Sequence, residues 1–195
     1  STKSATDLGA ALDSLADVVT FGVAPAVLVY KMHVTLPQWN VWRWVLWCLS
    51  LAYFLGAVLR LARFTAETSG QEQDHLCFRG LPSPGAAGTI ASLVIFYFYL
   101  VEFKQKELAL LVKWESELQS FAAIIPVFLP FLAGFLGYLM VSNKLRYVHV
   151  GGYLVNKKGF DSLVYLIFGA IVLAIFPEIF LPLLFLAYLL SAPIG

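Results

Sequence analysis

Long apolar runs separated by short polar segments dominate the chain. Six runs approach the length of about 20 residues that a membrane-spanning helix needs. They cover approximately Leu8–Tyr30, Trp39–Leu61, Gly85–Val101, Phe121–Val141, Phe160–Phe176 and Glu178–Ile194. Phe-Pro-Glu at 176–178 predicts a tight turn between the last two, which would then be antiparallel helices. The pattern predicts an all-α, polytopic transmembrane helix bundle that forms a single domain.

Composition agrees with this class of protein. The 195 residues are 60% hydrophobic and 13% charged, whereas soluble domains carry roughly 25% charged residues. The net charge of +1 gives no broad basic face, so we expect no nucleic-acid partner.

Alternating the six spans across a membrane predicts their orientation. The N-terminus and the loops 62–84 and 142–159 then share one side. That side collects eight of the thirteen basic residues, namely Lys3, Arg60, Arg63, Arg79, Lys144, Arg146, Lys157 and Lys158. Basic residues favour the cytoplasmic side, so we expect a multi-pass integral membrane protein with this side in the cytoplasm, in the cell membrane if the source is prokaryotic.

The loop 142–159 contains two β-prone runs around Gly151-Gly152. Such a pattern is typical of a hairpin with a tight turn. We predict a small cytoplasmic β-hairpin within Arg146–Gly159, between the fourth and fifth spans; a substrate lid is the alternative.

The first span is unusual because it contains two carboxylates. Gly9, Asp13 and Asp17 are spaced by four residues and share one stripe of a helix. Like charges at this spacing repel, and carboxylates within a span usually serve a function. A divalent cation would turn the repulsion into shared ligation, while Gly9 would let a bulky ligand approach the backbone. The alternative is a solvated helix start whose acids are incidental.

The Gly-x3-Asp-x3-Asp run, with "LDSLADVVTFGVAPA" around it, resembles the second half of the signature of CDP-alcohol phosphatidyltransferases. The first half of that signature, Asp-x2-Asp-Gly-x2-Ala-Arg followed by eight residues, would end immediately before Ser1. The resemblance therefore implies that this chain lacks the first two helices of a catalytic domain, and that the intact protein has about eight spans. It also implies a homodimer.

Three further stretches resemble the branch of that family named CDP-diacylglycerol–serine O-phosphatidyltransferases, or phosphatidylserine synthases. They are "GAVLRLARFT" at 56–65, "FRGLPSPGAAG" at 78–88 and "LMVSNKLRY" at 139–147. Ser83 and Pro84 suit the N-cap and first position of a helix, whose free N–H groups bind anions. A serine carboxylate or a phosphate would fit there; a plain loop-to-helix start is the alternative. The small residues at 85–88 predict close packing on a neighbouring helix.

The branch resemblance implies transfer of the phosphatidyl group from CDP-diacylglycerol to the hydroxyl of L-serine, with release of CMP. It implies that Asp13 and Asp17 bind a divalent metal, Mg²⁺ or Mn²⁺ first and Ca²⁺ as an alternative, and that Asp17 is also the general base. Arg63 is our first choice for a cation that binds the diphosphate or a carboxylate. The other candidates for substrate binding are Gly9, Arg60, Arg79, Ser83 and Arg146.

Several alternatives stay open at this point. The acceptor alcohol could be glycerol 3-phosphate or inositol phosphate, or the lipid an archaeal ether lipid. The arginines at 60 and 63 could simply extend to the membrane edge. A cation-binding transporter would show symmetrical halves with acids or broken helices near the midplane, and no internal repeat is visible in the sequence.

Overall fold

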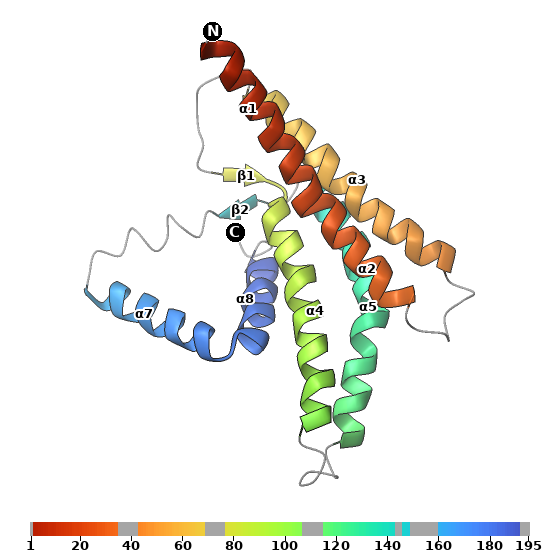
Figure 1. Ribbon diagram of the computed structural model, residues 1–195. Helices are drawn as coiled ribbons and strands as arrows, with labels where there is room; N and C mark the ends of the chain where they lie inside the picture. Colours follow the sequence, from red (N-terminus) through yellow and green to blue (C-terminus); the bar gives the residue numbers. More distant parts are fainter. Residues whose placement is uncertain are drawn as a thin grey trace.

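The computed structural model describes residues 2–34, 43–68, 77–106, 115–142, 146–148 and 160–191 (Figure 1). Its elements in chain order are α1 (Thr2–Asp17), the π-helix η1 (Val18–Val23), α2 (Ala24–Val34), α3 (Arg43–Thr68), β1 (Cys77–Arg79), α4 (Ser83–Lys106), α5 (Glu115–Val141), β2 (Arg146–Val148), α7 (Phe160–Ile175) and α8 (Pro177–Ser191). Apart from two strands of three residues each, every element is helical. The expected all-helical bundle is therefore confirmed.

Four helical segments are long and apolar enough to cross a membrane. They are Ala11–Met32, Arg43–Thr65, Ser83–Glu102 and Ala122–Val141, and they match the first four predicted spans. The last two predicted spans are the helices α7 and α8, of 16 and 15 residues, which is shorter than the usual range of about 17 to 25. The helical structure is interrupted between them at Phe176, close to the predicted turn.

The first span is one continuous rod with a π-helix in its middle. Pro25 follows this π-helix, and a proline in a helix has no N–H for the carbonyl four residues earlier, here that of Phe21. The Tyr53 hydroxyl on α3 donates to the Phe21 carbonyl at 2.9 Å. The bond that Pro25 removes inside one helix is thus replaced by a bond from its neighbour, which ties α3 to η1.

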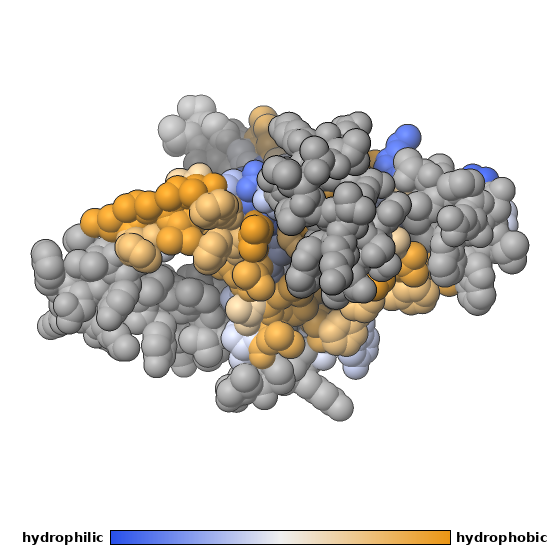
Figure 2. All heavy atoms as spheres, turned by 90° about the horizontal axis from the view of Figure 1, so that it is seen from below, coloured by the Kyte–Doolittle hydropathy of each residue, from blue (hydrophilic) through white to orange (hydrophobic). Residues whose placement is uncertain are grey.

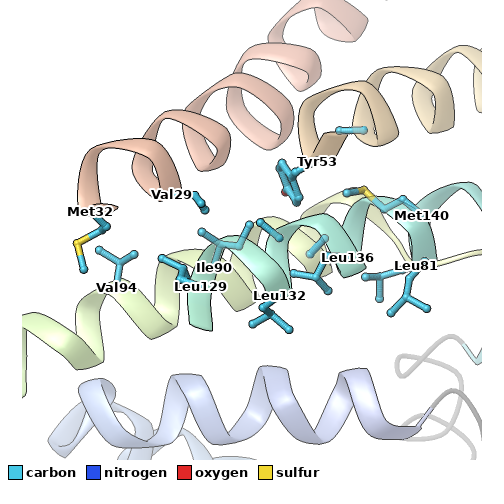
Figure 3. Packing of buried hydrophobic residues seen from close by; sticks show 14 residues of the cluster. Val29, Met32, Tyr53, Leu81, Ile90, Val94, Leu129, Leu132, Leu136 and Met140 are labelled. Atoms are coloured by element: carbon cyan, nitrogen blue, oxygen red, sulfur yellow. The ribbon is translucent and has the colours of Figure 1, made fainter. Parts of the chain in front are cut away.

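The backbones of α3 and α5 approach closely at two glycines. A Cβ on Gly56 would lie 2.6 Å from the Gly137 carbonyl oxygen, and one on Gly137 would lie 2.8 Å from the carbonyl oxygen of Ala52. Small residues permit this kind of contact between membrane helices. The core continues from there through α2 and α4 in a cluster that includes Val29, Tyr53, Ile90, Leu129 and Leu136 (Figure 3).

Helix α8 packs against the small-residue start of α4, as the sequence predicts for residues 85–88. A Cβ on Gly85 would lie 2.8 Å from Cε1 of Tyr188, and one on Gly88 would overlap the ring of Phe185. Because the earlier residue of α4 meets the later residue of α8, the two helices are antiparallel. The end of α8 therefore lies beside the beginning of α4.

The two strands join distant parts of the chain. β1 and β2 are antiparallel, with Phe78 opposite Tyr147 and Arg79 opposite Arg146. Gly80 then turns with φ +83°, and a Cβ there would lie 2.8 Å from the Met140 carbonyl oxygen. The predicted hairpin stays a prediction, because 149–159 lie outside the described residues; the strand at its start pairs with β1.

Among the described residues, apolar side chains dominate the face shown in Figure 2. Large ones remain exposed on the spans, for example Phe98 on α4, Phe135 on α5 and Trp44 at the start of α3, which is 78% exposed. Exposing this much apolar surface to water would be unfavourable for a soluble monomer. Lipid chains can cover the same surface without that cost. The fold is that of a multi-pass membrane protein.

Candidate functional site

The carboxylate stripe lies on the last turns of α1. Gly9 and Asp13 are exposed, and Asp17 is half-buried at the final position of the helix. A Cβ added to Gly9 would meet no atom of the described residues within 4 Å. The π-helix begins at the next residue, and such irregular turns occur frequently at functional sites. The predicted helical stripe is confirmed; its first two members are exposed and its last is half-buried.

Helix register brings this stripe level with the end of α3. A Cβ on Gly22 would lie 3.4 Å from Cδ2 of Phe54 and 3.6 Å from Cβ of Ala57. The two rods run antiparallel (Figure 1), so the level of Asp17, five residues before Gly22, corresponds to that of Arg60. The register alone relates the two groups, since no described contact joins the carboxylates to Arg60 directly.

Arg60 reaches across to the start of α4. Its Nη1 donates to the Ser83 hydroxyl oxygen at 3.3 Å, and Ser83 is only 6% exposed. The Nε atom of Arg60 is buried and has no hydrogen-bond partner among the described residues. A buried guanidinium donor without a partner is uncommon in proteins, so this atom is a natural position for an anion to bind.

Helix α4 begins one residue earlier than the sequence suggests. The Ala86 N–H donates to the Pro82 carbonyl at 3.1 Å, which makes Pro82 the capping residue and Ser83 the first helical residue. Ser83 is thus not the capping residue that the sequence suggests, and its side chain accepts a hydrogen bond from Arg60 of the neighbouring helix. The predicted helix start at this point of the chain is otherwise confirmed.

The remaining candidate arginines lie at the same end of the bundle. Arg63 is half-buried, one turn beyond Arg60 on α3. Arg79 and Arg146 are partners in the β1–β2 register, a pairing that the sequence did not predict. The Leu81 N–H, just after β1, donates to the Leu139 carbonyl at the end of α5 at 3.4 Å. This contact fixes the two strands beside the start of α4.

Sequence reasoning missed one neighbour of this cluster. Tyr188 of α8 covers Gly85, on the first turn of α4 and two residues after Ser83, the partner of Arg60. The only signal in the sequence was the pair of glycines at 85 and 88, which predicts a close neighbour for α4 without saying which helix it is.

The described residues offer few donor groups for a metal ion. Among the described residues, no group of three or more His, Cys, Asp or Glu side chains could hold a metal ion. Asp13 and Asp17 thus supply two carboxylates, whereas Mg²⁺ takes six ligands, mostly oxygen. The two residues fit part of a hard-cation site whose other ligands would be water, substrate oxygens or other residues.

Taken together, the site consists of an acidic helical stripe and a cluster of arginines at one end of a membrane-spanning bundle. The chain belongs to the CDP-alcohol phosphatidyltransferase family, which matches residues 1–132.

Relatives of this chain carry names from that family. The archaetidylserine synthase of Methanothermobacter thermautotrophicus is 40% identical over 91 residues, which are 47% of this chain and 35% of the relative. A CDP-diacylglycerol–serine O-phosphatidyltransferase of Bacillus subtilis is 37% identical over 92 residues, 47% of this chain and 46% of the relative. The enzyme of the same name from Helicobacter pylori strain 26695 is 33% identical over 149 residues, 75% of this chain and 51% of the relative. The chain thus spans about a third to a half of the length of these relatives, and no solved structure matches it.

Proposed function

We propose that this protein transfers the phosphatidyl group of CDP-diacylglycerol to the hydroxyl of L-serine and releases CMP. The observation that carries the proposal is the Arg60–Ser83 contact. This contact lies at the level of Asp17, and the chain belongs to the CDP-alcohol phosphatidyltransferase family. The names of the relatives support serine as the acceptor. Family membership also argues against the cation transporter considered from the sequence.

In this proposal Asp17 is the general base. Its carboxylate accepts the proton of the serine hydroxyl as the serine oxygen bonds to the phosphorus that carries the lipid. The bond from that phosphorus to the CMP oxygen then breaks, and CMP leaves with the electron pair. Asp17 suits this role because it is half-buried beside the irregular turn η1, where its position is more restricted than that of the exposed Asp13. A positioned base of this kind accelerates reactions by about 10² to 10⁴-fold.

Asp13 and Asp17 together would hold a divalent metal ion, Mg²⁺ or Mn²⁺ first and Ca²⁺ as the alternative. When bound, such an ion neutralises and orients a diphosphate. Gly9, with open space around it, would leave room for the nucleotide on the same stripe. Without a cation, Asp13 and Asp17 would repel each other and the negatively charged lipid headgroup.

Arg60 and Ser83 would bind the carboxylate of serine. The unpartnered Nε is available to an anion while Nη1 remains bonded to Ser83, and a guanidinium presents adjacent N–H groups that match a carboxylate. Arg63, one turn away, would complete the positive charge near the diphosphate.

Arg79 and Arg146 would bind the phosphates of the CDP-lipid. Their positions are directly paired in the β1–β2 ladder, which brings two basic residues together beside the start of α4. Acyl chains would remain among membrane lipids beside the exposed apolar faces, while CMP and serine exchange with the cytoplasm. We further propose that the protein acts as a homodimer.

The test is release of CMP by the purified full-length protein. CDP-diacylglycerol and the corresponding CDP-activated ether lipid are each supplied with L-serine, glycerol 3-phosphate or inositol phosphate, with and without Mg²⁺ or Mn²⁺. We expect release with serine only, and only with a divalent cation. Preference for the ether lipid would place the protein nearer the archaetidylserine synthase that it resembles. Release with another alcohol would contradict serine as the acceptor.

Asp17→Asn tests the role of the base. The substitution keeps the shape of the side chain and removes its basicity, so we expect kcat to fall at least about 100-fold. Glu102→Gln, an exposed acid near the end of α4 and far from the stripe, is the matched control and should retain wild-type kcat. Near-normal turnover of the Asp17→Asn variant, with far-UV circular dichroism unchanged, would show that Asp17 is not the base.

A further inference from the structure

We propose that Tyr188 of α8 is a positioning residue that fixes the Arg60 guanidinium in the acceptor site. The inference rests on the proposed function, because it assumes that Arg60 and Ser83 bind the acceptor. It adds that α8, which lies beyond the residues that match the family, forms one wall of that site.

The first argument is the position of the Tyr188 ring. A Cβ on Gly85 would lie 2.8 Å from Cε1 and 3.4 Å from Cδ1 of Tyr188, so the ring occupies the space that a side chain at position 85 would fill. Gly85 is two residues after Ser83, on the first turn of α4. The ring is half-buried, and it lies on the same turn of α4 that Arg60 contacts through Ser83.

The second argument concerns the guanidinium. Ser83 holds Nη1 at 3.3 Å, which fixes only one of its three nitrogens. The Cζ atom of Tyr188, which bears the hydroxyl, would lie 3.9 Å from a Cβ on Gly85, so the phenol reaches the first turn of α4, where Ser83 holds Nη1. Arg60 thus meets α4 at the turn on which α8 is seated, while its buried Nε has no partner among the described residues. A donor held in place before the ligand arrives loses less freedom on binding, which strengthens affinity.

The third argument is the way α8 is seated on α4. Gly85 faces Tyr188 and Gly88 faces Phe185, so two successive turns of α8 fit against glycines of α4. Phe185 accounts for packing alone, because its ring has no polar group. The hydroxyl of Tyr188 is the feature that packing does not require, and Tyr188 faces Gly85, the glycine that lies nearer in the chain to Ser83, the partner of Arg60.

Tyr188→Phe in the full-length protein tests this inference. The variant keeps the ring on Gly85 and removes the hydroxyl. With saturating CDP-diacylglycerol, we expect KM for serine to rise about five-fold, with kcat within about two-fold of wild type. Tyr138→Phe, an exposed tyrosine on α5, is the matched control and should leave both constants unchanged. A KM for serine equal to that of the Tyr138→Phe control would overturn the inference.

A second pair of measurements separates positioning from folding. Tyr188→Leu removes the ring and should lower the melting temperature in detergent. Tyr188→Phe keeps the ring and should have the same melting temperature as the wild type. If both variants melt equally early, the hydroxyl serves folding and the inference is wrong. If wild type releases CMP with another alcohol and not with serine, the serine assignment fails, and the KM of that alcohol reports on Tyr188 instead. Absence of release with every alcohol would contradict both proposals.

Discussion

The Tyr53 side chain replaces a helical hydrogen bond that Pro25 cannot make. Pro25 leaves the Phe21 carbonyl without its usual helical donor, and the Tyr53 hydroxyl supplies one at 2.9 Å. Tyr53 is fully buried, so no water replaces this bond if it is lost. We therefore expect Tyr53→Phe to lower the free energy of unfolding by about 1 kcal/mol, the usual net value of such a bond. Unfolding in mixed detergent micelles, followed by far-UV circular dichroism, measures this change.

The matched test uses Pro25→Ala, which restores an N–H at position 25. In the Pro25→Ala background the Phe21 carbonyl has a donor in its own helix, so Tyr53→Phe should cost less there than in the wild type. Tyr138→Phe, on an exposed tyrosine, should cost nothing in either background. Equal costs of Tyr53→Phe in the two backgrounds would show that the hydroxyl does not compensate for the proline.

Residues that act within one helix could be predicted from the sequence, and residues that act between helices could not. The spacing of Gly9, Asp13 and Asp17 fixes their common stripe because helical geometry is local. The partner of Ser83 is different, because it depends on how α3 packs beside α4. The sequence proposed Arg60, Arg63, Arg79 and Arg146 as candidates, and only packing shows that Arg60 reaches Ser83 and that Arg79 pairs with Arg146.

At the scale of elements, the crossing of α3 and α5 depends on Gly56 and Gly137. In Gly56→Ala the new Cβ would lie 2.6 Å from a backbone oxygen, which cannot move as a flexible side chain does. We expect a loss of about 1–3 kcal/mol from overpacking, measured by the same detergent unfolding. Gly169→Ala on α7, where a Cβ meets nothing within 4 Å, is the control and should not destabilise the protein. Equal stability of the Gly56→Ala variant and the wild type would contradict the close approach of α3 and α5.

The elements themselves were largely predictable, and their pairing was only partly so. Runs of about 20 apolar residues identify the first four spans, and the small residues at 85–88 correctly predict a close neighbour for α4. The β1–β2 pair was not predicted, because a three-residue strand carries little sequence signal and its partner lies far away in the chain. The local Gly151-Gly152 turn favoured a hairpin instead. Contacts between distant segments are set by the fold of the whole bundle.

At the scale of the whole molecule, the helices place the acidic stripe and the arginine cluster at one end. α3 ends where α4 begins, as the Arg60–Ser83 contact shows, so Thr65 and Glu102 lie at opposite ends of the bundle. Both residues are exposed. From the distribution of basic residues, we propose that the end that contains Thr65 faces the cytoplasm. The same assignment places the proposed site where a nucleotide-activated lipid and free serine would both reach it.

Cysteine labelling tests this orientation independently of activity. In a background with Cys48→Ser and Cys77→Ser, we introduce Thr65→Cys or Glu102→Cys and treat intact cells with a membrane-impermeant maleimide. The Glu102→Cys variant should be labelled in intact cells, and the Thr65→Cys variant only after permeabilisation, because the reagent cannot cross the bilayer. The reverse pattern would place Asp13, Asp17 and Arg60 outside the cell. A carboxylate pair that faces the exterior could not use cytoplasmic CDP-lipid, so that result would contradict the orientation and the proposed reaction together.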